Sequence, residues 1–170
     1  MIFTKKYTIL GEKLEIKEIF IMVSAIKERS FLAYVFLTII TFGIYPIVYW
    51  TKISNEVNVL CEGDGKKTMK YVYAWFLAII TFGIFGIVWE HQLANRLKEN
   101  AARYNLNFSE SGALVTVYNT IGHAYLGFGR LIAGFILTKN FNKIAVAFNE
   151  YNGLVDIEAD EKANLFADAE

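Results

Sequence analysis

A six-residue apolar segment occurs twice in this chain, at a fixed offset of forty residues. Residues 39–44 read Ile-Ile-Thr-Phe-Gly-Ile, and residues 79–84 read the same. The agreement extends beyond this segment, because Ile47-Val48 matches Ile87-Val88 and Asn55 matches Asn95 in the same phase. The pattern predicts two tandem copies of one helical module, over residues 30–69 and 70–109.

Both copies lie in runs that contain no charged side chain. These runs cover residues 30–51 and 71–89, and a third covers residues 111–129. About 20 predominantly apolar residues suffice to cross the hydrocarbon core of a bilayer. Three such runs are hard to bury inside a soluble chain of 170 residues. The sequence therefore predicts an all-α integral membrane protein whose third, glycine-rich membrane segment covers residues 111–138.

Glycine and proline interrupt the apolar runs. Proline suits the first turn of a helix and disrupts its interior, so Pro46 favours two helices, at residues 30–42 and 45–60. Two geometries remain open: one kinked transmembrane helix from Phe31 to Trp50, or a re-entrant hairpin whose Thr-Phe-Gly corner lies within the membrane. The positions predicted to kink or pack helices are Gly43, Pro46, Gly83, Gly86, Gly127 and Gly129.

The two ends of the chain differ from the membrane domain, which is predicted to cover residues 29–149. Apolar residues recur at helical spacing between Glu12 and Ile26, so residues 1–28 are predicted to contain an interfacial amphipathic helix. A hairpin through residues 7–10 is the alternative. The charges in this segment argue against a secretory signal. Residues 150–170 carry one lysine among many acidic residues and are predicted to form a solvated tail.

Residues 61–68, Cys-Glu-Gly-Asp-Gly-Lys-Lys-Thr, form the most distinctive polar motif. Free backbone N–H groups and lysine ammonium groups both favour phosphate, so Asp64, Lys66 and Lys67 are candidates for a loop that binds an anion or a lipid headgroup. A tight solvated turn is the alternative interpretation. The spacing of a Walker A loop is absent.

Four polar residues are candidates for positions within the membrane or at its interface: Asn55, Asn95, His123 and Arg130. The two asparagines are predicted to hydrogen-bond across helices. His123 and Arg130 would share a face if one continuous helix carried both. Gly127 and Gly129 are expected to break that helix, and this places Arg130 at an interface where it reaches headgroups, rather than on an ion or proton path.

Other functions leave no trace in the sequence. We find no nucleophile–base pair, no paired carboxylates and no nucleotide-binding loop, and the two histidines lack partners at metal-ligand spacing. We therefore expect no enzymatic activity, no cofactor and no metal, and the lysine distribution gives no support for nucleic-acid binding. The single cysteine, Cys61, fits a reducing compartment.

Several motifs occur together in the order found in one known family. These are Ser30-Phe31-Leu32, the two Ile-Thr-Phe-Gly-Ile corners, residues 61–68, Asn95-Arg96-Leu97, Arg103-Tyr104, Asn107-Phe108-Ser109-Glu110, and Asn140 with Asn142 and Lys143. The chain resembles the bacterial membrane family called domain of unknown function 4234, over roughly residues 29–149. The resemblance implies an integral membrane protein and supplies no activity, cofactor or catalytic residue.

The expected function is structural. We expect a non-enzymatic membrane protein that self-associates as a homo-oligomer or binds a membrane protein partner, in contact with lipids of the bacterial cytoplasmic (inner) membrane. Small residues would permit close helix contacts. The alternative is a small channel or carrier whose path runs through the kinked helices past His123 and Arg130.

Overall fold

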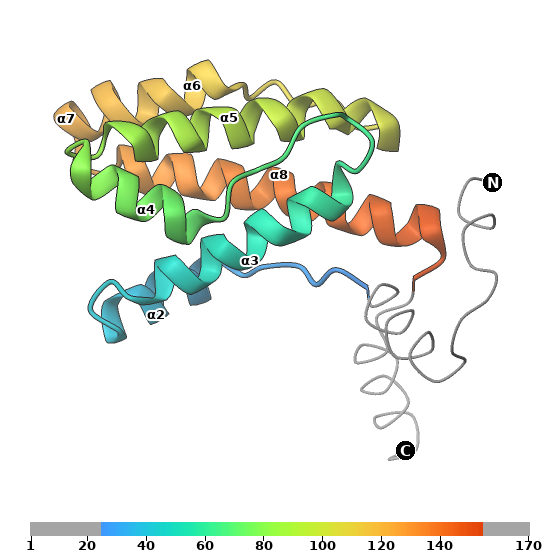
Figure 1. The fold of residues 1–170 in the computed structure, drawn as a ribbon, viewed down its shortest axis with the longest axis horizontal. Helices are drawn as coiled ribbons and strands as arrows, with labels where there is room; N and C mark the ends of the chain where they lie inside the picture. The colour runs from blue at the N-terminus through green and yellow to red at the C-terminus, as the bar shows by residue number, and fades with distance from the viewer. Residues whose placement is uncertain (1–24, 155–170) are drawn as a thin grey trace, which may run out of the picture. The chain divides into compact units, whose positions relative to one another are not determined.

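The computed structural model describes residues 25–154, and these residues form helices joined by short turns (Figure 1). The described part contains no strand, which confirms the all-α class. Within it, Ile26–Asn152 forms one unit with its own hydrophobic core. The predicted amphipathic helix from Glu12 and most of the acidic tail lie outside the described residues.

The elements follow one another along the chain with few residues between them. They are α2 (Phe31–Ile40), α3 (Tyr45–Leu60), α4 (Tyr71–Ile80), α5 (Ile84–Ala101), the 3-10 helix η2 (Ala102–Tyr104), α6 (Gly112–Val117), the π-helical segment η3 (Tyr118–Gly122), α7 (His123–Leu126) and α8 (Gly129–Asn152).

The first uncharged run folds into a helical hairpin. Helix α2 ends at Ile40 and α3 begins at Tyr45, and the chain reverses direction between them (Figure 1). The reversal brings Tyr34 beside α3, where its ring centroid lies 4.5 Å from that of Tyr49 and its hydroxyl accepts a hydrogen bond from Trp50 Nε1 at 3.4 Å. The alternative of one kinked helix from Phe31 to Trp50 is therefore wrong.

Two further hairpins follow. Helices α4 and α5 form the second, and the segments α6, η3 and α7 pack against α8 to form the third. Figure 1 shows the three reversals at the same end of the helix bundle. The third reversal occurs at Gly127, so this glycine and Gly129 do separate His123 from Arg130, as predicted from their flexibility.

Local sequence explains where the first two helices begin. The Ser30 side chain accepts a hydrogen bond from the Ala33 N–H at 3.2 Å and caps α2. Pro46 lies in the first turn of α3, where the missing N–H has no intrahelical partner to lose. The predicted break at Pro46 is thus a helix start.

The core lies where α3, α5 and α8 meet. It is formed by aromatic and branched aliphatic side chains with little or no exposure, among them Trp50, Ile53, Trp89, Leu97 and Phe141. Helix α8 contacts both α3 and α5. This arrangement holds the three hairpins together and fixes which faces remain on the outside.

Within residues 25–154, only α8 is long and apolar enough to cross a bilayer. Half of its most apolar window is buried inside the bundle, so this one helix is weak support for a membrane location. Helices α2 and α4 are more apolar than α8 but have only 10 residues each. Transmembrane spans through the first two uncharged runs, and hence a multi-pass topology, gain no support from helices of this length.

Candidate membrane-facing surface

The hairpin tips, residues 41–44, 81–84 and 125–128, form the candidate site. At the first tip, Thr41 Oγ1 donates to the Leu37 carbonyl at 2.7 Å and accepts from the Tyr45 N–H at 2.9 Å. Its side chain therefore connects the end of α2 to the start of α3. Gly43 N donates to the Thr38 carbonyl at 2.8 Å and closes the turn.

The second tip makes the same hydrogen bonds. Thr81 Oγ1 donates to the Leu77 carbonyl at 2.8 Å and accepts from the Phe85 N–H at 3.0 Å. Gly83 N donates to the Ala78 carbonyl at 2.7 Å. These bonds give partners to backbone groups that two helix ends would otherwise leave without one. Such internal pairing reduces the number of backbone polar groups that would lack a partner in hydrocarbon.

Each of these two tips exposes a phenylalanine in a strained conformation. Phe42 and Phe82 both have φ of +50°, in the left-handed region that large side chains rarely adopt. Their side chains are 97% and 98% exposed. Glycine or asparagine would relieve the strain and suit water better. Packing in the core therefore does not explain why phenylalanine occupies these two positions.

The third tip is also aromatic. Gly127 reverses the chain with φ of +69°, and the exposed side chains beside it are Tyr125 and Phe128. Gly129 lies so close to the carbonyl of Tyr118 that no larger residue fits. Gly43, Gly83 and Gly127 thus serve chain reversal, whereas Gly129 permits a close contact.

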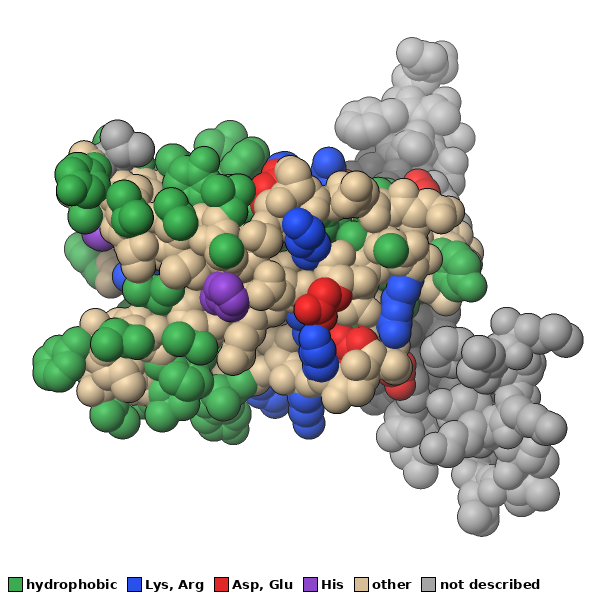
Figure 2. Space-filling view, turned by 90° about the horizontal axis from the view of Figure 1, so that it is seen from above, with side chains coloured by type: hydrophobic (Ala, Val, Ile, Leu, Met, Phe, Trp, Pro, Cys, Tyr) green, Lys and Arg blue, Asp and Glu red, His purple; other side chains and the backbone are tan. Residues whose placement is uncertain are grey.

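Exposed apolar side chains concentrate on the hairpins near these tips. Apart from Val59, Met69, Val146 and Tyr151, every exposed large hydrophobic residue in the described part lies in the uncharged runs or in the first two turns of α8. Figure 2 shows hydrophobic side chains covering one end of the molecule, with the Lys, Arg, Asp and Glu side chains mainly in the middle and toward the other end. A contiguous apolar surface of this kind marks an interaction site.

The depth of the apolar end matches half a bilayer. Helices α2 and α4 have 10 residues each without a charge, and this corresponds to about 15 Å along the helix axis. The hydrocarbon core of a whole bilayer measures about 30 Å. On α8 the next charged residue after Arg130 is Lys139, which lies about 14 Å further along the helix. An apolar layer of this depth suits one leaflet.

The predicted anion loop is organised around Arg96. The Arg96 guanidinium donates to both Asp64 carboxylate oxygens, at 2.8 and 3.0 Å, and to Asn58 Oδ1 and the Thr68 hydroxyl at 2.6 and 2.7 Å. It also donates to the Lys66 carbonyl at 2.8 Å. We call these contacts the Arg96 clamp. They hold residues 64–68 against α3 and α5.

The contacts of the three predicted loop residues, Asp64, Lys66 and Lys67, can be compared with the predicted anion site. Asp64 is committed to Arg96, and Lys66 forms an ion pair with Glu99. Lys67 is exposed, and no partner is recorded for it within the described residues. Hydrogen bonds from Arg96 hold the pKa of Asp64 well below its usual range. The geometry therefore supports the solvated-turn alternative more than an anion site.

Cys61, the residue before this loop, is buried. Its side chain is fully covered, and desolvation raises the pKa of its thiol to about 11. A protonated, covered thiol reacts slowly with alkylating reagents. Cysteines introduced elsewhere can therefore be labelled selectively.

The two equivalent asparagines have different environments. Asn95 Oδ1 accepts from the Gly112 N–H at 2.8 Å, and Asn95 Nδ2 lies 3.0 Å from His91 Nε2. Gly112 is itself too close to the His91 carbonyl to carry a side chain. Asn55 is exposed, and no hydrogen bond is recorded for it in residues 25–154. Of the two predicted cross-helix contacts, the one at Asn95 is present.

His123 and Arg130 lie on different helices, α7 and α8, and both are exposed. Arg130 borders a cavity of about 250 Å³ together with Tyr71 and Gly83. It lies within electrostatic range of Glu90, a buried carboxylate that accepts a hydrogen bond from Asn119. Arg130 is the second residue of α8 and lies close to the third tip.

Several contacts in this part of the protein were not predicted from the sequence. Arg96 stands 32 residues from Asp64, and Glu90 stands 29 residues from Asn119. No local spacing relates residues so far apart. The described residues contain no group of three His, Cys, Asp or Glu side chains that could hold a metal ion.

Comparisons with known proteins identify one family. No curated protein and no solved structure gave a significant match. Residues 29–99 match the model of the family described as Domain of unknown function (DUF4234), in agreement with the resemblance seen in the sequence motifs. The matched segment, residues 29–99, contains the first hairpin, most of the second and the Asp64–Arg96 ion pair.

Proposed function

We propose that this protein is a non-enzymatic membrane module that inserts its hairpin tips into one leaflet. In this arrangement both ends of each hairpin lie on one side of the membrane, which we take to be the cytoplasmic side of a bacterial inner membrane. The polar end then forms a surface for a second copy of the chain or for a membrane protein partner.

The exposed phenylalanines at the tips are the observation that carries the proposal. Phe42 and Phe82 accept backbone strain and are almost completely exposed. Strained residues persist where they serve a function. In water these side chains would cost free energy, whereas in hydrocarbon each contributes about 1.5–3 kcal/mol by leaving water. The matching hydrogen bonds at the two tips also support the proposal that the hairpins are copies of one module.

The distribution of lysine and arginine supports placing all polar segments on the same side of the membrane. Lysine or arginine occurs in each of the segments between the uncharged runs, for example at Lys52, Lys67 and Lys98. A translocated segment would be poor in these residues. The proposal therefore places all polar loops on the cytoplasmic side.

Accessibility of introduced cysteines tests this topology. Cysteines replace Phe42, Phe82, Lys67 and Asn105 one at a time in inverted membrane vesicles and in spheroplasts, with a membrane-impermeant maleimide as reagent. Residues 67 and 105 should react only when the cytoplasmic side is exposed. Residues 42 and 82 should be protected from both sides. The buried Cys61 gives the background, measured in the unmodified chain.

Two results would contradict the proposal. One is labelling of residue 42 or 82 from the periplasmic side, which requires a full crossing. The other is labelling of these residues from the cytoplasmic side at the rate of residue 67, which places the tips in water. Self-association is tested separately, by the mass of the protein–detergent complex measured with light scattering. A strictly monomeric protein would leave only the partner-binding form of the proposal.

A further inference from the structure

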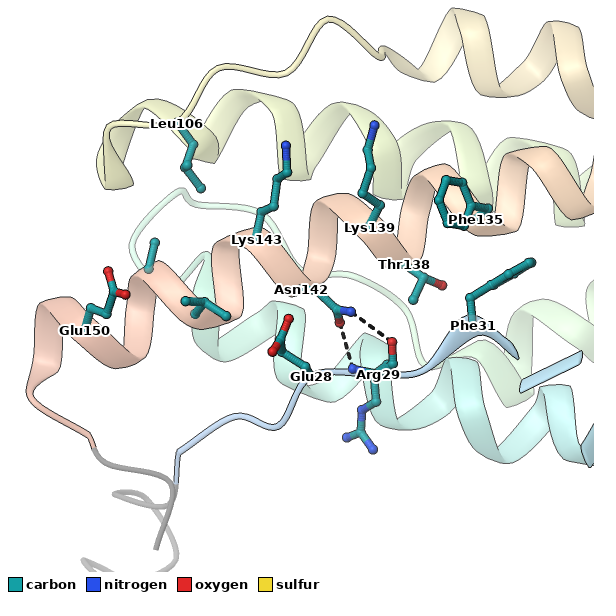
Figure 3. A pocket seen from close by; sticks show the side chains of 12 residues that line it. Glu28, Arg29, Phe31, Leu106, Phe135, Thr138, Lys139, Asn142, Lys143 and Glu150 are labelled. Atoms are coloured by element: carbon teal, nitrogen blue, oxygen red, sulfur yellow. Dashed lines mark hydrogen bonds between the residues drawn. The ribbon is translucent and has the colours of Figure 1, made fainter. Parts of the chain in front are cut away.

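A groove of about 560 Å³ runs along α8 next to the segment that precedes α2. Its lining includes Glu28, Phe31, Phe135, Lys139 and Lys143 (Figure 3). The groove changes character along its length. Phe31 and Phe135 lie toward the apolar end of the bundle, whereas Lys139 and Lys143 follow on α8 by about 6 and 12 Å from Phe135. It therefore crosses the level at which the uncharged layer ends.

The wall opposite α8 is fixed in place by Asn142. This side chain accepts from the Arg29 N–H at 2.8 Å and donates to the Arg29 carbonyl at 2.9 Å, as the dashed lines in Figure 3 show. The Arg29 guanidinium points away from the groove (Figure 3) and pairs with Glu56. Glu28, the preceding residue, is thereby held at about the level of Lys143 on the other wall.

Opposite charges thus border the groove, and Lys139 and Lys143 extend toward the side of Leu106, away from the segment that carries Glu28 (Figure 3). Lys143 and Glu28 are both exposed, and the structure records no ion pair for either within the described residues. Lys139 pairs with Glu110, but an ammonium group has three donors and retains capacity for a further acceptor. Glu150 also borders the groove, about 10 Å beyond Lys143 along the helix.

We propose that this groove binds one phospholipid whose headgroup carries both a phosphate and a primary ammonium, as in phosphatidylethanolamine. The phosphate lies between Lys139 and Lys143, the ammonium hydrogen-bonds to Glu28, and the first part of an acyl chain lies over Phe31 and Phe135. The inference rests on the proposed membrane insertion, which brings the groove to the level of the headgroups.

The charge pattern selects this class of lipid. A lipid with a glycerol headgroup offers the phosphate but no cation for Glu28. A choline headgroup carries a positive charge but no N–H to donate to the carboxylate, so it loses a charge-assisted hydrogen bond. An ethanolamine headgroup satisfies both walls of the groove.

Titration with short-chain lipids tests the proposal. The full-length protein in a neutral maltoside detergent is titrated with dihexanoyl phosphatidylethanolamine, phosphatidylcholine and phosphatidylglycerol, with ³¹P NMR as the readout. The ethanolamine lipid should bind roughly tenfold more tightly than the other two, the effect of one charge-assisted hydrogen bond. Lys143→Ala should weaken binding of all three lipids, and Glu28→Gln should remove the preference for ethanolamine. Lys67→Ala, which removes an exposed lysine outside the groove, serves as the control.

Equal binding of the three lipids by the wild-type protein would overturn the proposal. So would unchanged selectivity in Glu28→Gln, or equal weakening by Lys67→Ala and Lys143→Ala. Circular dichroism establishes that each variant is folded. Insertion is measured separately, in vesicles of pure phosphatidylcholine, where the tips alone should be sufficient. Loss of selectivity with intact insertion would reject the lipid site only, and loss of insertion would reject the proposed function.

Discussion

Arg96 binds Asp64 through two parallel hydrogen bonds, Nε to Oδ2 at 2.8 Å and Nη2 to Oδ1 at 3.0 Å. The pair joins the loop after α3 to the middle of α5. Both side chains are largely covered, with 5% and 10% exposure. The planar guanidinium matches the carboxylate geometry in a way that a lysine ammonium cannot.

Replacement of Arg96 should therefore be among the most destabilising changes in the polar half. Arg96→Ala leaves the Asp64 carboxylate covered and without its cation, which typically costs about 3–5 kcal/mol. Arg96→Lys should recover only part of this loss. Chemical denaturation in detergent measures the free energy of unfolding. Lys98→Ala, on the same helix and outside the clamp, is the control, and equal effects of the two alanine variants would contradict this role.

The same carboxylate should make stability depend on acid pH. The folded-state pKa of Asp64 is lowered by Arg96, so its contribution is complete above the unfolded value of about 3.9 and is lost as pH falls toward the folded value. Glu110, hydrogen-bonded by Lys139, has its pKa lowered to about 2 and acts in the same direction below about pH 4.3. The melting temperature should fall steadily between pH 4 and pH 2. In the Asp64→Asn variant, which starts from lower stability, the slope should be smaller. An unchanged slope would show that Asp64 does not titrate in this range.

Charge at the tips should prevent membrane binding without unfolding the bundle. Phe42→Asp and Phe82→Asp each place a carboxylate in the hydrocarbon, which insertion scales put at about 2.5–3.5 kcal/mol. The partition coefficient between vesicles and water, measured by flotation, should therefore fall roughly a hundredfold for either change. Val59→Asp alters a 48% exposed residue of α3 far from the tip and should float like the wild type. Normal flotation of the Phe42→Asp/Phe82→Asp double variant would refute the tip model.

Glycine is needed at the two corners because the backbone there has a positive φ. Lack of room for a side chain is not the reason. Gly43 and Gly83 have φ of +84° and +90°, and a Cβ atom at either would meet no atom within 4 Å. Alanine should therefore destabilise each hairpin by about 1–2 kcal/mol through left-handed strain alone. Gly86→Ala is the matched control, since its Cβ would lie 3.6 Å from that of Ala78, an ordinary contact. The melting temperature of Gly86→Ala should be higher than those of Gly43→Ala and Gly83→Ala. The reverse order would exclude backbone strain as the cause of the destabilisation.

Glu90 and Arg130 should show energetic coupling. Arg130→Ala leaves a buried carboxylate without the nearby cation, so it should destabilise the bundle, whereas Arg130→Lys retains the charge. In the Glu90→Gln background, Arg130→Ala should cost less, with a coupling free energy of about 0.5–3 kcal/mol. A double-mutant cycle of unfolding free energies measures this value. Strict additivity would mean that the two charges do not interact.

The sequence predicted those features of the fold that depend on interactions between residues close together in the chain. The uncharged runs predicted helices, and Gly43, Pro46 and Gly127 predicted the places where helices end, because φ preferences and missing N–H groups act within a turn. The choice between a kinked span and a hairpin depends on whether Tyr34 meets Trp50. That contact arises from packing between helices, and no spacing within either helix specifies it.

The candidate site was predictable to a smaller degree. Residues 61–68 predict a polar loop, but the partners of Asp64 and Lys66, Arg96 and Glu99, lie more than 30 residues further along the chain on α5. Asn95 was expected to bond across helices, and it does so with Gly112. Its counterpart Asn55 occupies the equivalent position in the sequence repeat, yet is exposed, because α6 packs against α5, the helix that carries Asn95. Tandem symmetry in a sequence need not extend to contacts with a third element.

The threonine-closed corners have a consequence for how the hairpins would enter a membrane under the proposed function. Each of these two corners pairs several of its own backbone groups, so fewer N–H and C=O groups would have to be desolvated if the hairpin left water already folded. In the proposed arrangement both ends of each hairpin stay on one side of the membrane, so no lysine or aspartate of the polar loops has to pass through hydrocarbon. If the proposed function holds, entry of these two hairpins into the leaflet requires neither a translocation channel nor a transmembrane potential, and either hairpin can enter first.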